Sequence, residues 1–492
     1  MIRAQLPALL VVVPLLAAPV IVLARRAALA WALALAASWS SFAIAIALFL
    51  QVRAAGVVSY AMGSWPPPWG IEYRIDALGA FVLVLVAGMG AVVAPYMRRS
   101  AAAEVPGERL YLFYAMYMLC LAGLLGIVAT GDAFNLFVFL EIASLSTYVL
   151  IALGRDRRSL LAAFQYLIMG TIGATFYVIG VGLLYLMTGT LNIADMAARL
   201  PAVTETRPLV AAAAFVTVGI SLKLALFPLH FWLPNAYTYA PSAVTAFLAA
   251  TATKVSVYVL LRYFFTIFGA SPAFAEVPFQ EALLALSAIA IVTASLVAVY
   301  QPDMKRMLAY SSVAQIGYIT LGIAMANRAG LTGAIVHLFN HGITKGALFL
   351  LLGGVAMRAG RASFDCLAGL GRAMPLTSFG IVIGGLSLIG IPGTAGFVSK
   401  WYLVLGAIER GEWWLAVLVV GSSLIAVAYV WRFVEAAYLQ PPGPASPRPG
   451  EAPLALLVPA WLLVGACVWF GLSTSFNVGG AATAGQLLLG AR

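Results

Sequence analysis

The stretch LYLFYAMYMLCLAGLLGIVA, residues 110–129, contains no charged side chain and is long enough to cross a lipid bilayer as a helix. A helix needs about 20 apolar residues to span the hydrocarbon core. Similar windows recur on both sides of this stretch, and together they predict an all-α polytopic membrane protein with about 14 transmembrane helices. The windows cover residues 5–24, 28–50, 77–96, 110–129, 133–153, 163–187, 208–230, 241–265, 281–300, 306–326, 330–356, 376–405, 413–437 and 453–472.

The composition of the chain points the same way. Of its 492 residues, 63% are hydrophobic and only 9% are charged, and the mean hydropathy of +1.01 excludes a soluble globular protein. The net charge of +11 does not indicate nucleic-acid binding, because the charges are scattered through the loops. Counted loop by loop, fifteen Lys and Arg fall on one side and nine on the other. The richer side is expected in the cytoplasm, which places both termini outside.

The N-terminal run is expected to be a retained first span, and the cysteines indicate no redox site. Arg3, an apolar run and a small-residue site near Ala28 resemble a signal peptide, but Arg25 and Arg26 directly after the run fit a retained first span better. The sequence contains no Walker A loop and no dinucleotide fingerprint. Three cysteines lie far apart and form no CxxC motif, so they support neither an iron–sulfur site nor a disulfide framework; they are Cys120, Cys366 and Cys467.

Two spans contain internal breaks. Pro228 interrupts the seventh span, and the sequence GIPG at 390–393, which includes Pro392, interrupts the twelfth. Proline removes a backbone hydrogen bond, and in lipid the freed carbonyls must be satisfied by protein or water, so such breaks line cavities. Two other segments, 51–76 and 438–452, are rich in proline or polar residues and are expected to form ordered loops outside the membrane.

The breaks divide the single transmembrane domain, residues 1–492, into comparable halves. Spans four to eight cover residues 110–265, spans nine to thirteen cover 281–437, and the fourth span of each block is broken. Because each block has an odd number of spans, the sequence predicts two inverted five-helix repeats. Broken helices at corresponding places of two halves are typical of a transport site.

Four of the five lysines lie inside apolar spans, and only Lys305 is expected in a loop. A lysine at the centre of a spanning helix costs about 2.5–3.5 kcal/mol, so a buried series of them indicates function. Arginine cannot release its proton in a protein, whereas a desolvated lysine can. The loops use arginine almost exclusively, so the sequence keeps fixed charge in the loops and releasable charge in the membrane.

Glu141 is the only carboxylate deep in a span, and Lys223 is its natural partner. Such a pair can be switched, since protonation of the carboxylate or separation of the two groups changes the charge on the lysine. The alternative is a static ion pair that holds helices in register. Lys254 lies among hydroxyl side chains in the eighth span and is expected in a hydrated pocket, with snorkelling to the interface as the alternative.

His337, His341 and Lys345 are spaced four residues apart and lie on one face of the eleventh span. An HxxxH pair can bind zinc, but no third ligand lies nearby in sequence, so no metal site is predicted. The histidines could instead be structural, each bonded to a backbone carbonyl. A proton relay is favoured because histidine titrates near neutral pH. Lys400 follows the second break and has no evident carboxylate partner. It is the last of the titratable groups within the spans, which we call the row: Glu141, Lys223, Lys254, His337, His341, Lys345 and Lys400.

Around these residues the chain resembles the antiporter-like proton-pumping subunits of respiratory complex I, of membrane-bound hydrogenases and of Mrp-type cation/proton antiporters. The matching stretches are KLALFPLHFWLPNA at 223–236, DMKRMLAYSS at 303–312, HLFNHGITK at 337–345 and GIPGTAGF at 390–397. Within this family the chain is most similar to the D subunit of the Mrp antiporter. That similarity is carried by GSWPPPWGI at 63–71, TGTLNIAD at 188–195 and AQIGY at 314–318.

The resemblance implies a role for each residue of the row. Glu141 resembles the carboxylate that gates the first half-channel, and Lys223 its partner and proton carrier. Lys254 resembles a connector, the two histidines a central bridge and Lys400 the terminal proton site. His230, Pro228 and Pro392 would be accessory.

Two positions depart from the family pattern. Tyr237 stands where many relatives have a second histidine, and Gln315 where several have a histidine. They bear on the cytoplasmic access route and the central relay that the resemblance implies. They do not affect the buried lysines.

The resemblance implies a multi-pass subunit in the cell membrane of a prokaryote, without a cofactor or redox centre of its own. Its expected partners are other integral membrane subunits, protons, a monovalent cation and the lipid bilayer. The primary interpretation is the D subunit of an Mrp-type Na⁺/H⁺ antiporter. The alternatives are a proton-pumping subunit of a redox-driven complex, part of a translocase of the NADH:quinone oxidoreductase or membrane-bound hydrogenase kind, a scaffold that transports nothing, and a standalone carrier of a small solute.

Overall fold

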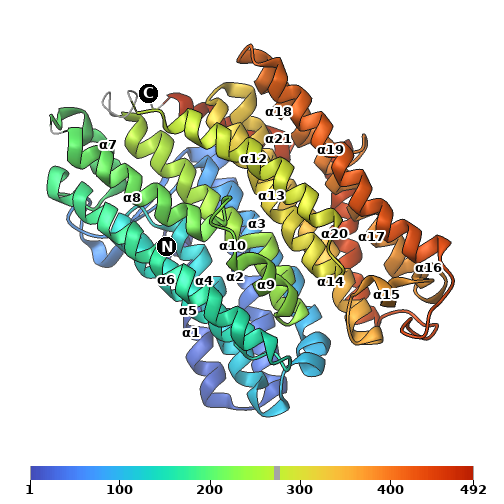
Figure 1. The fold of residues 1–492 in the computed structure, drawn as a ribbon. Helices are drawn as coiled ribbons and strands as arrows, with labels where there is room; N and C mark the ends of the chain where they lie inside the picture. The colour runs from blue at the N-terminus through green and yellow to red at the C-terminus, as the bar shows by residue number, and fades with distance from the viewer. Residues whose placement is uncertain (1, 205, 271–276, 491–492) are drawn as a thin grey trace.

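The protein forms one bundle of long helices that lie side by side (Figure 1). Its structure is a computed structural model that describes residues 2–204, 206–270 and 277–490. Thirteen helices in the described ranges are long and apolar enough to cross a membrane. The predicted all-helical membrane fold is therefore confirmed, whereas the count of about 14 spans rests on how the broken twelfth window is counted.

The helices of the first half follow the predicted windows to within a few residues at most ends. They are α1 (Ile2–Ala24), α2 (Ala27–Ala55), α3 (Ala77–Glu104), α4 (Leu110–Ala129), α5 (Ala133–Ala152), α6 (Arg158–Thr188), α7 (Ile193–Arg199), α8 (Thr206–Leu224), α9 (Trp232–Tyr239) and α10 (Ser242–Leu261). The π-helical turn η4 (Arg262–Ile267) continues α10.

The helices of the second half include the longest one, α14. They are α12 (Phe279–Val299), α13 (Met304–Met325), α14 (Arg328–Ala359), α15 (Phe364–Leu367), α16 (Leu370–Ala373), α17 (Pro375–Ile389), α18 (Ala395–Glu409), α19 (Trp413–Val434), α20 (Leu454–Leu472) and α21 (Asn477–Gly490). Short 3₁₀ or π turns complete the description: η1 (Met62–Ser64), η2 (Gly107–Arg109), η3 (Leu200–Ala202), η5 (Phe268–Ala270) and η6 (Glu435–Leu439).

Asp or Asn side chains begin several of the spanning helices. The Asp132 carboxylate accepts from the backbone N–H of Asn135 at 2.7 Å at the start of α5, and Asp303 does the same for Arg306 at 3.1 Å at the start of α13. Such caps satisfy amides that have no partner within the helix. They fix where α5 and α13 enter the membrane, and these two helices carry or contact the residues of the row.

Both predicted helix breaks are present. Helix α8 ends at Leu224, within the seventh window, and residues 225–231, which contain Pro228, separate it from α9, which begins beyond the window; the twelfth window is divided into α17 and α18 by residues 390–394. Gly390 and Gly393 adopt φ values of 89° and 85° in the second break, a conformation that favours glycine. Pro234 lies in the first turn of α9, where proline is tolerated, and does not extend the break.

Helices α10, α13 and α14 form the interior of the bundle, and α10 packs against both α14 and α3. Helices α1, α2, α6, α12 and α19 leave one side uncovered. Those sides carry large apolar residues such as Leu161, Ile172 and Leu424, as expected for surfaces in contact with lipid or other membrane subunits. Two of these three enclosed helices, α10 and α14, carry Lys254, the histidines and Lys345.

The structure also differs from the sequence predictions. Lys305, expected in a loop, lies in the first turn of α13 and is buried, because Asp303 begins the helix earlier than the apolar window does. The segment 51–76 contains a hairpin of β1 (Val58–Ala61) and β2 (Glu72–Ile75), paired antiparallel with Val58 opposite Ile75. Helix α21, which follows the last predicted span, is not among the predicted windows; it is too short to span a bilayer and is rich in glycine, a weak helix former.

Candidate functional site

Glu141 and Lys223 form the first part of the site. Lys223 Nζ lies 3.6 Å from Glu141 Oε1 and donates a hydrogen bond to Ser144 Oγ at 2.7 Å. Glu141 Oε1 accepts no hydrogen bond from the residues that the structure describes. The side chain of Glu141 is 28% exposed, whereas that of Lys223 is 6% exposed. The expected pair is thus loosely closed: the lysine is bound to a neutral hydroxyl, and the Glu141 side chain is partly exposed although its Oε1 is buried.

Lys223 occupies the last turn of α8, directly before the break. Trp232 Nε1, at the start of α9, donates to the carbonyl of Leu222 at 2.9 Å and so satisfies one of the carbonyls that the break frees. A gap of about 10 Å³ lies between α5, α8 and α10 and is lined by Lys223, Tyr177 and Ser256. This volume is close to that needed for one water molecule. The gap leads from Lys223 toward α10, the helix of Lys254.

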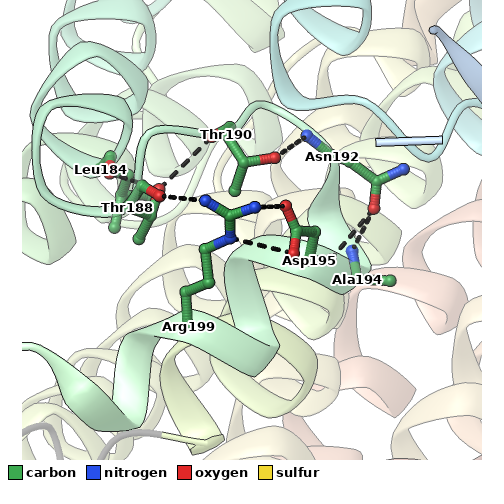
Figure 2. Close-up of polar contacts among 7 residues, drawn as sticks. All are labelled: Leu184, Thr188, Thr190, Asn192, Ala194, Asp195 and Arg199. Carbon is green, nitrogen blue, oxygen red and sulfur yellow. Dashed lines mark hydrogen bonds and ion pairs between the residues drawn. The ribbon is translucent and has the colours of Figure 1, made fainter. Parts of the chain in front are cut away.

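The start of α5 is anchored by a polar cluster at the turn between α6 and α7 (Figure 2). The Arg199 guanidinium contacts the Asp195 carboxylate at 2.8 Å and donates to the carbonyl of Thr188 at 3.1 Å. Asn192 caps α7 through its side-chain oxygen, and its backbone pairs with that of Asp132, the cap of α5. The helix that presents Glu141 is therefore tied to a rigid turn.

Lys254 lies in the middle of α10 and is 1% exposed. Its Nζ donates to the carbonyl of Ala249 at 2.5 Å and to Thr253 Oγ1 at 3.2 Å. No carboxylate within the described residues forms an ion pair with it. Snorkelling to the interface is excluded, because the side chain reaches back along its own helix into the protein interior.

His337 and His341 stack on one face of α14, with ring centroids 5.8 Å apart and planes inclined by 6°. His337 Nδ1 is 2.7 Å from Ser399 Oγ, and its Nε2 is 2.8 Å from Gln315 Oε1. Neither ring nitrogen of His341 has a hydrogen-bond partner among the described residues. Lys345 Nζ donates to the carbonyl of Leu308 on α13 at 2.7 Å and also to Ser311 Oγ.

The ammonium of Lys254 lies beside α14, near the level of Gly342. A Cβ on Gly342 of α14 would be 2.9 Å from the carbonyl oxygen of Ala250, so this part of α10 faces α14 between His341 and Lys345. Lys254 Nζ is bonded to the carbonyl of the preceding residue, Ala249. Lys254 therefore lies beside α14, whereas His337, His341 and Lys345 follow one another along α14 at intervals of about 6 Å.

Lys400 ends the row and also stabilises the second break. Its Nζ donates to the carbonyls of Ile389 at 2.8 Å and Leu388 at 3.3 Å, which the end of α17 leaves free, and to Ser423 Oγ at 2.8 Å. It also lies 4.8 Å from the ring centroid of Tyr318. The preceding residue, Ser399, binds His337, so α18 joins the histidine bridge to Lys400. No carboxylate in the part of the chain that the structure covers pairs with Lys400.

The accessory residues lie in or beside the breaks and not in the row. The ring of His230 lies between those of Phe227 and Phe231, at centroid distances of 5.3 and 5.2 Å, and its Nδ1 has no hydrogen-bond partner within the described ranges. Pro228 and Pro392 lie in the two breaks. No group of three His, Cys, Asp or Glu side chains converges on a possible metal position in the part of the chain that is described.

Sequence reasoning missed several neutral groups that contact the row. Gln315, noted only as a departure from the family pattern, is a direct partner of His337. Ser144, Ser311, Ser399 and Ser423 each contact one member of the row. Serines in a span ordinarily bond their own helix backbone, so sequence position alone gave no sign of these contacts.

The close contact between the halves of the second broken span gives a stability prediction. A Cβ on Gly396 would lie 1.7 Å from the carbonyl oxygen of Ser387, so Gly396→Ala must push α18 away from α17. We expect the free energy of unfolding to fall by about 1–3 kcal/mol, measured by thermal unfolding of the purified protein in detergent. The control is Gly421→Ala, where nothing lies within 4 Å of the added carbon. Equal melting temperatures for the two variants would contradict the contact.

Two broken helices joined by buried lysines and histidines define an antiporter-like subunit, a class of helical membrane protein that holds titratable groups within the bilayer. The model of the NADH:quinone oxidoreductase/Mrp antiporter transmembrane family matches residues 130–426. The chain belongs to this family, and the resemblance inferred from the sequence is confirmed.

Relatives carry names from both branches of the family. The chain is 44% identical over 489 residues to the N subunit of NADH-quinone oxidoreductase from Desulforudis audaxviator, covering 95% of this chain and 96% of that protein. It is 32% identical over 384 residues to the D subunit of the Na⁺/H⁺ antiporter from Alkalihalophilus pseudofirmus, covering 78% and 76%. A chain in the structure of the Mrp complex from Dietzia sp. superposes with a TM-score of 0.91 at 27% identity, covering 99% of this chain and 98% of that one. The protein is thus an antiporter-like membrane subunit of a multisubunit complex.

Proposed function

We propose that the chain moves protons across the membrane along its buried row of titratable side chains. The observation that supports this most strongly is that buried lysines lie at both broken helices, with Lys254, the histidines and Lys345 buried between them. Its members are Glu141, Lys223, Lys254, His337, His341, Lys345 and Lys400.

The surroundings of the lysines favour transport over a static role. A buried ion pair that only fixes helix register needs a closed, fully hydrogen-bonded geometry. Lys223 instead donates to Ser144 and stands 3.6 Å from the carboxylate. Lys254 and Lys400 donate to carbonyl and hydroxyl oxygens, which hold an ammonium without fixing its charge. A lysine in such a place can give up its proton without leaving a buried carboxylate unpaired.

We infer two candidate couplings. Exchange against a monovalent cation, Na⁺, is supported by the relatives named as D subunits of Na⁺/H⁺ antiporters and by the stretches at 63–71, 188–195 and 314–318. Coupling to a redox reaction in other subunits is supported by 44% identity to the N subunit of an NADH-quinone oxidoreductase along almost the whole chain. In both cases this chain supplies the proton path and other membrane subunits supply the coupling.

We also propose the orientation that the loop charges favour. The ends of α3, α5 and α14 would face the cytoplasm, and the β1–β2 hairpin would face outward. Residues 1 and 491–492 lie outside the described ranges, so the orientation rests on the loops and not on the termini.

The test is to purify the native complex through a tag on this chain and to reconstitute it in liposomes that contain a pH-sensitive dye. An Na⁺ gradient that drives proton movement without any redox substrate supports cation exchange. Co-purification of a soluble flavin or iron–sulfur arm, with proton movement only during electron transfer, supports the redox-driven candidate. Absence of proton movement under both conditions would overturn the proposed function, and activity of the isolated chain would identify a standalone carrier.

A further inference from the structure

A polar cavity of about 990 Å³ opens between the two five-helix blocks, at the membrane face where α3, α5 and α14 end. The first block contributes the turn after α5 and the end of α9. The second block contributes the segments before α13 and after α14. Its lining includes Arg155, Asp156, Arg158, Asp303, Arg306 and Arg361. We call this cavity the vestibule.

The inner end of the vestibule holds a chain of three polar side chains. Glu104 Oε2, at the end of α3, accepts from Ser242 Oγ at 3.0 Å and from the Ser242 backbone N–H at 2.8 Å. Lys305 Nζ donates to the same Ser242 Oγ at 2.9 Å. Glu104 and Lys305 both line the cavity, yet Lys305 is only 7% exposed. A buried lysine therefore stands between bulk water and the protein interior, joined to a carboxylate through one hydroxyl.

Lys305 lies on the same helix as the two residues that bind Lys345. It lies on α13 three residues before Leu308 and six before Ser311, and those two residues bind the ammonium of Lys345. At 1.5 Å per residue the distance along the helix from Lys305 to Ser311 is about 9 Å. Ser242 likewise begins α10, the helix of Lys254. Glu104, Ser242 and Lys305 thus lie at or beside the starts of α10 and α13. Helix α10 carries Lys254, and α13 contacts Lys345.

Carboxyl groups at the vestibule mouth differ in how readily they hold a proton. Hydrogen bonds from Arg158 lower the pKa of Asp156, so this group stays ionised. Burial raises the pKa of Asp303, against the lowering effects of its hydrogen bonds with backbone amides and of the nearby charges of Lys305 and Arg158. Asp303 is therefore the one of these two carboxyl groups that more readily takes up a proton from the vestibule.

We propose that the vestibule is a proton inlet that enters the row between the two blocks, with Glu104, Ser242 and Lys305 passing protons to Lys345. This inference rests on the proposed function, because it assumes that the row carries protons. It adds an entry point that belongs to neither block and a proton-carrying role for Lys305. The Glu104 carboxyl gives its proton to the Ser242 oxygen, and the Ser242 hydroxyl gives its own proton to the neutral Lys305 amine. The Lys305 ammonium then gives a proton to the neutral amine of Lys345, so that at each step one bond to hydrogen breaks and one forms.

The test compares two replacements of Lys305 in the reconstituted complex. Lys305→Met removes the carrier, and we expect proton movement to slow by about tenfold or more. Lys305→Arg keeps the charge and the hydrogen bond but cannot release a proton, so it is expected to be equally slow. Imidazole at millimolar concentration, small enough for the cavity, should restore part of the rate in Lys305→Met. Glu104→Gln gives a second variant of unchanged shape, expected to be slowed in the same way.

Each outcome decides between the inlet and a structural role. A slow Lys305→Met with a normal Lys305→Arg would show that Lys305 only holds α10 and α13 together, and would overturn the inlet. Normal rates of proton movement in both Lys305→Met and Glu104→Gln would also overturn the inlet. If Lys305→Met fails to assemble, Glu104→Gln with and without imidazole decides the question. Arg410→Gln, at the opposite membrane face, is the control expected to keep the normal rate.

The reference variant Lys223→Ala separates failure of the inlet from failure of the proposed function. If Lys223→Ala is inactive while the Lys305 variants are normal, the row carries protons but the inlet is elsewhere. If Lys223→Ala is as active as the unmodified complex, the proposed function itself is wrong.

Discussion

Replacement of Lys223 by alanine is expected to abolish proton movement while the complex still assembles. Lys223 is the member of the row that contacts a carboxylate, and it stands at the end of α8 where the broken helix opens toward α10. Without it no group in the described part of the chain bridges Glu141 and the gap beside Ser256. Positioned proton carriers in enzymes contribute about 10²–10⁴ in rate, so we expect a loss of at least about 100-fold in the initial rate of liposome acidification.

The companion variant Lys223→Arg distinguishes a carrier from a scaffold. Arginine keeps the positive charge beside Glu141 and can still bind Ser144, so a scaffold would tolerate it. A carrier would not, because the guanidinium does not release a proton. Arg207→Ala removes an exposed charge at the start of the same helix and should leave transport unchanged. Full transport in Lys223→Arg would contradict the proposed role.

Replacement of Lys400 by methionine is expected to lower both transport and stability. Its ammonium satisfies the carbonyls of Leu388 and Ile389 at the end of α17. Methionine cannot donate to them, and leaving a buried carbonyl unsatisfied costs about 1–3 kcal/mol. The loss should appear as a lower melting temperature of the purified complex together with loss of proton movement in liposomes.

For Lys400 the arginine variant is again the decisive comparison. Lys400→Arg can donate to the same carbonyls, so the melting temperature should recover further than transport does. The matched control is Trp401→Ala, because the neighbouring side chain is 53% exposed and lies on the outside of the bundle. Recovery of both properties in Lys400→Arg would mean that Lys400 acts only as a brace for the broken helix.

The sequence predicted the features that depend on hydrophobicity and on the cost of burying charge. The long apolar windows, the breaks at Pro228 and at 390–393, and the pairing of Glu141 with Lys223 are all present. These features have strong local signals, since a charged group in lipid and a proline in a helix are each costly. The relation of the two five-helix blocks by inversion remains a prediction.

What the sequence did not predict depends on which helices meet. The contact of Gln315 with His337 joins α13 to α14, and that of Ser399 with His337 joins α18 to α14. Helical periodicity states which residues share a face but not which helix that face meets. Lys305 shows the same limit. A polar first turn read as a loop in sequence proved to be the buried floor of a cavity, because α3 and α10 close around it.

The placement of Lys254 beside Gly342, between His341 and Lys345, has an electrical consequence. A unit charge that crosses the whole membrane gains or loses about 2.3 kcal/mol per 100 mV. Transfer from Lys254 to α14 at this level runs nearly parallel to the membrane plane and crosses little of that voltage. His337, His341 and Lys345 are about 6 Å apart along α14, so each step between them crosses a further part of the voltage. The membrane potential would therefore act on the steps along α14 and on the loading and unloading of the row, and least on the step from Lys254 to α14.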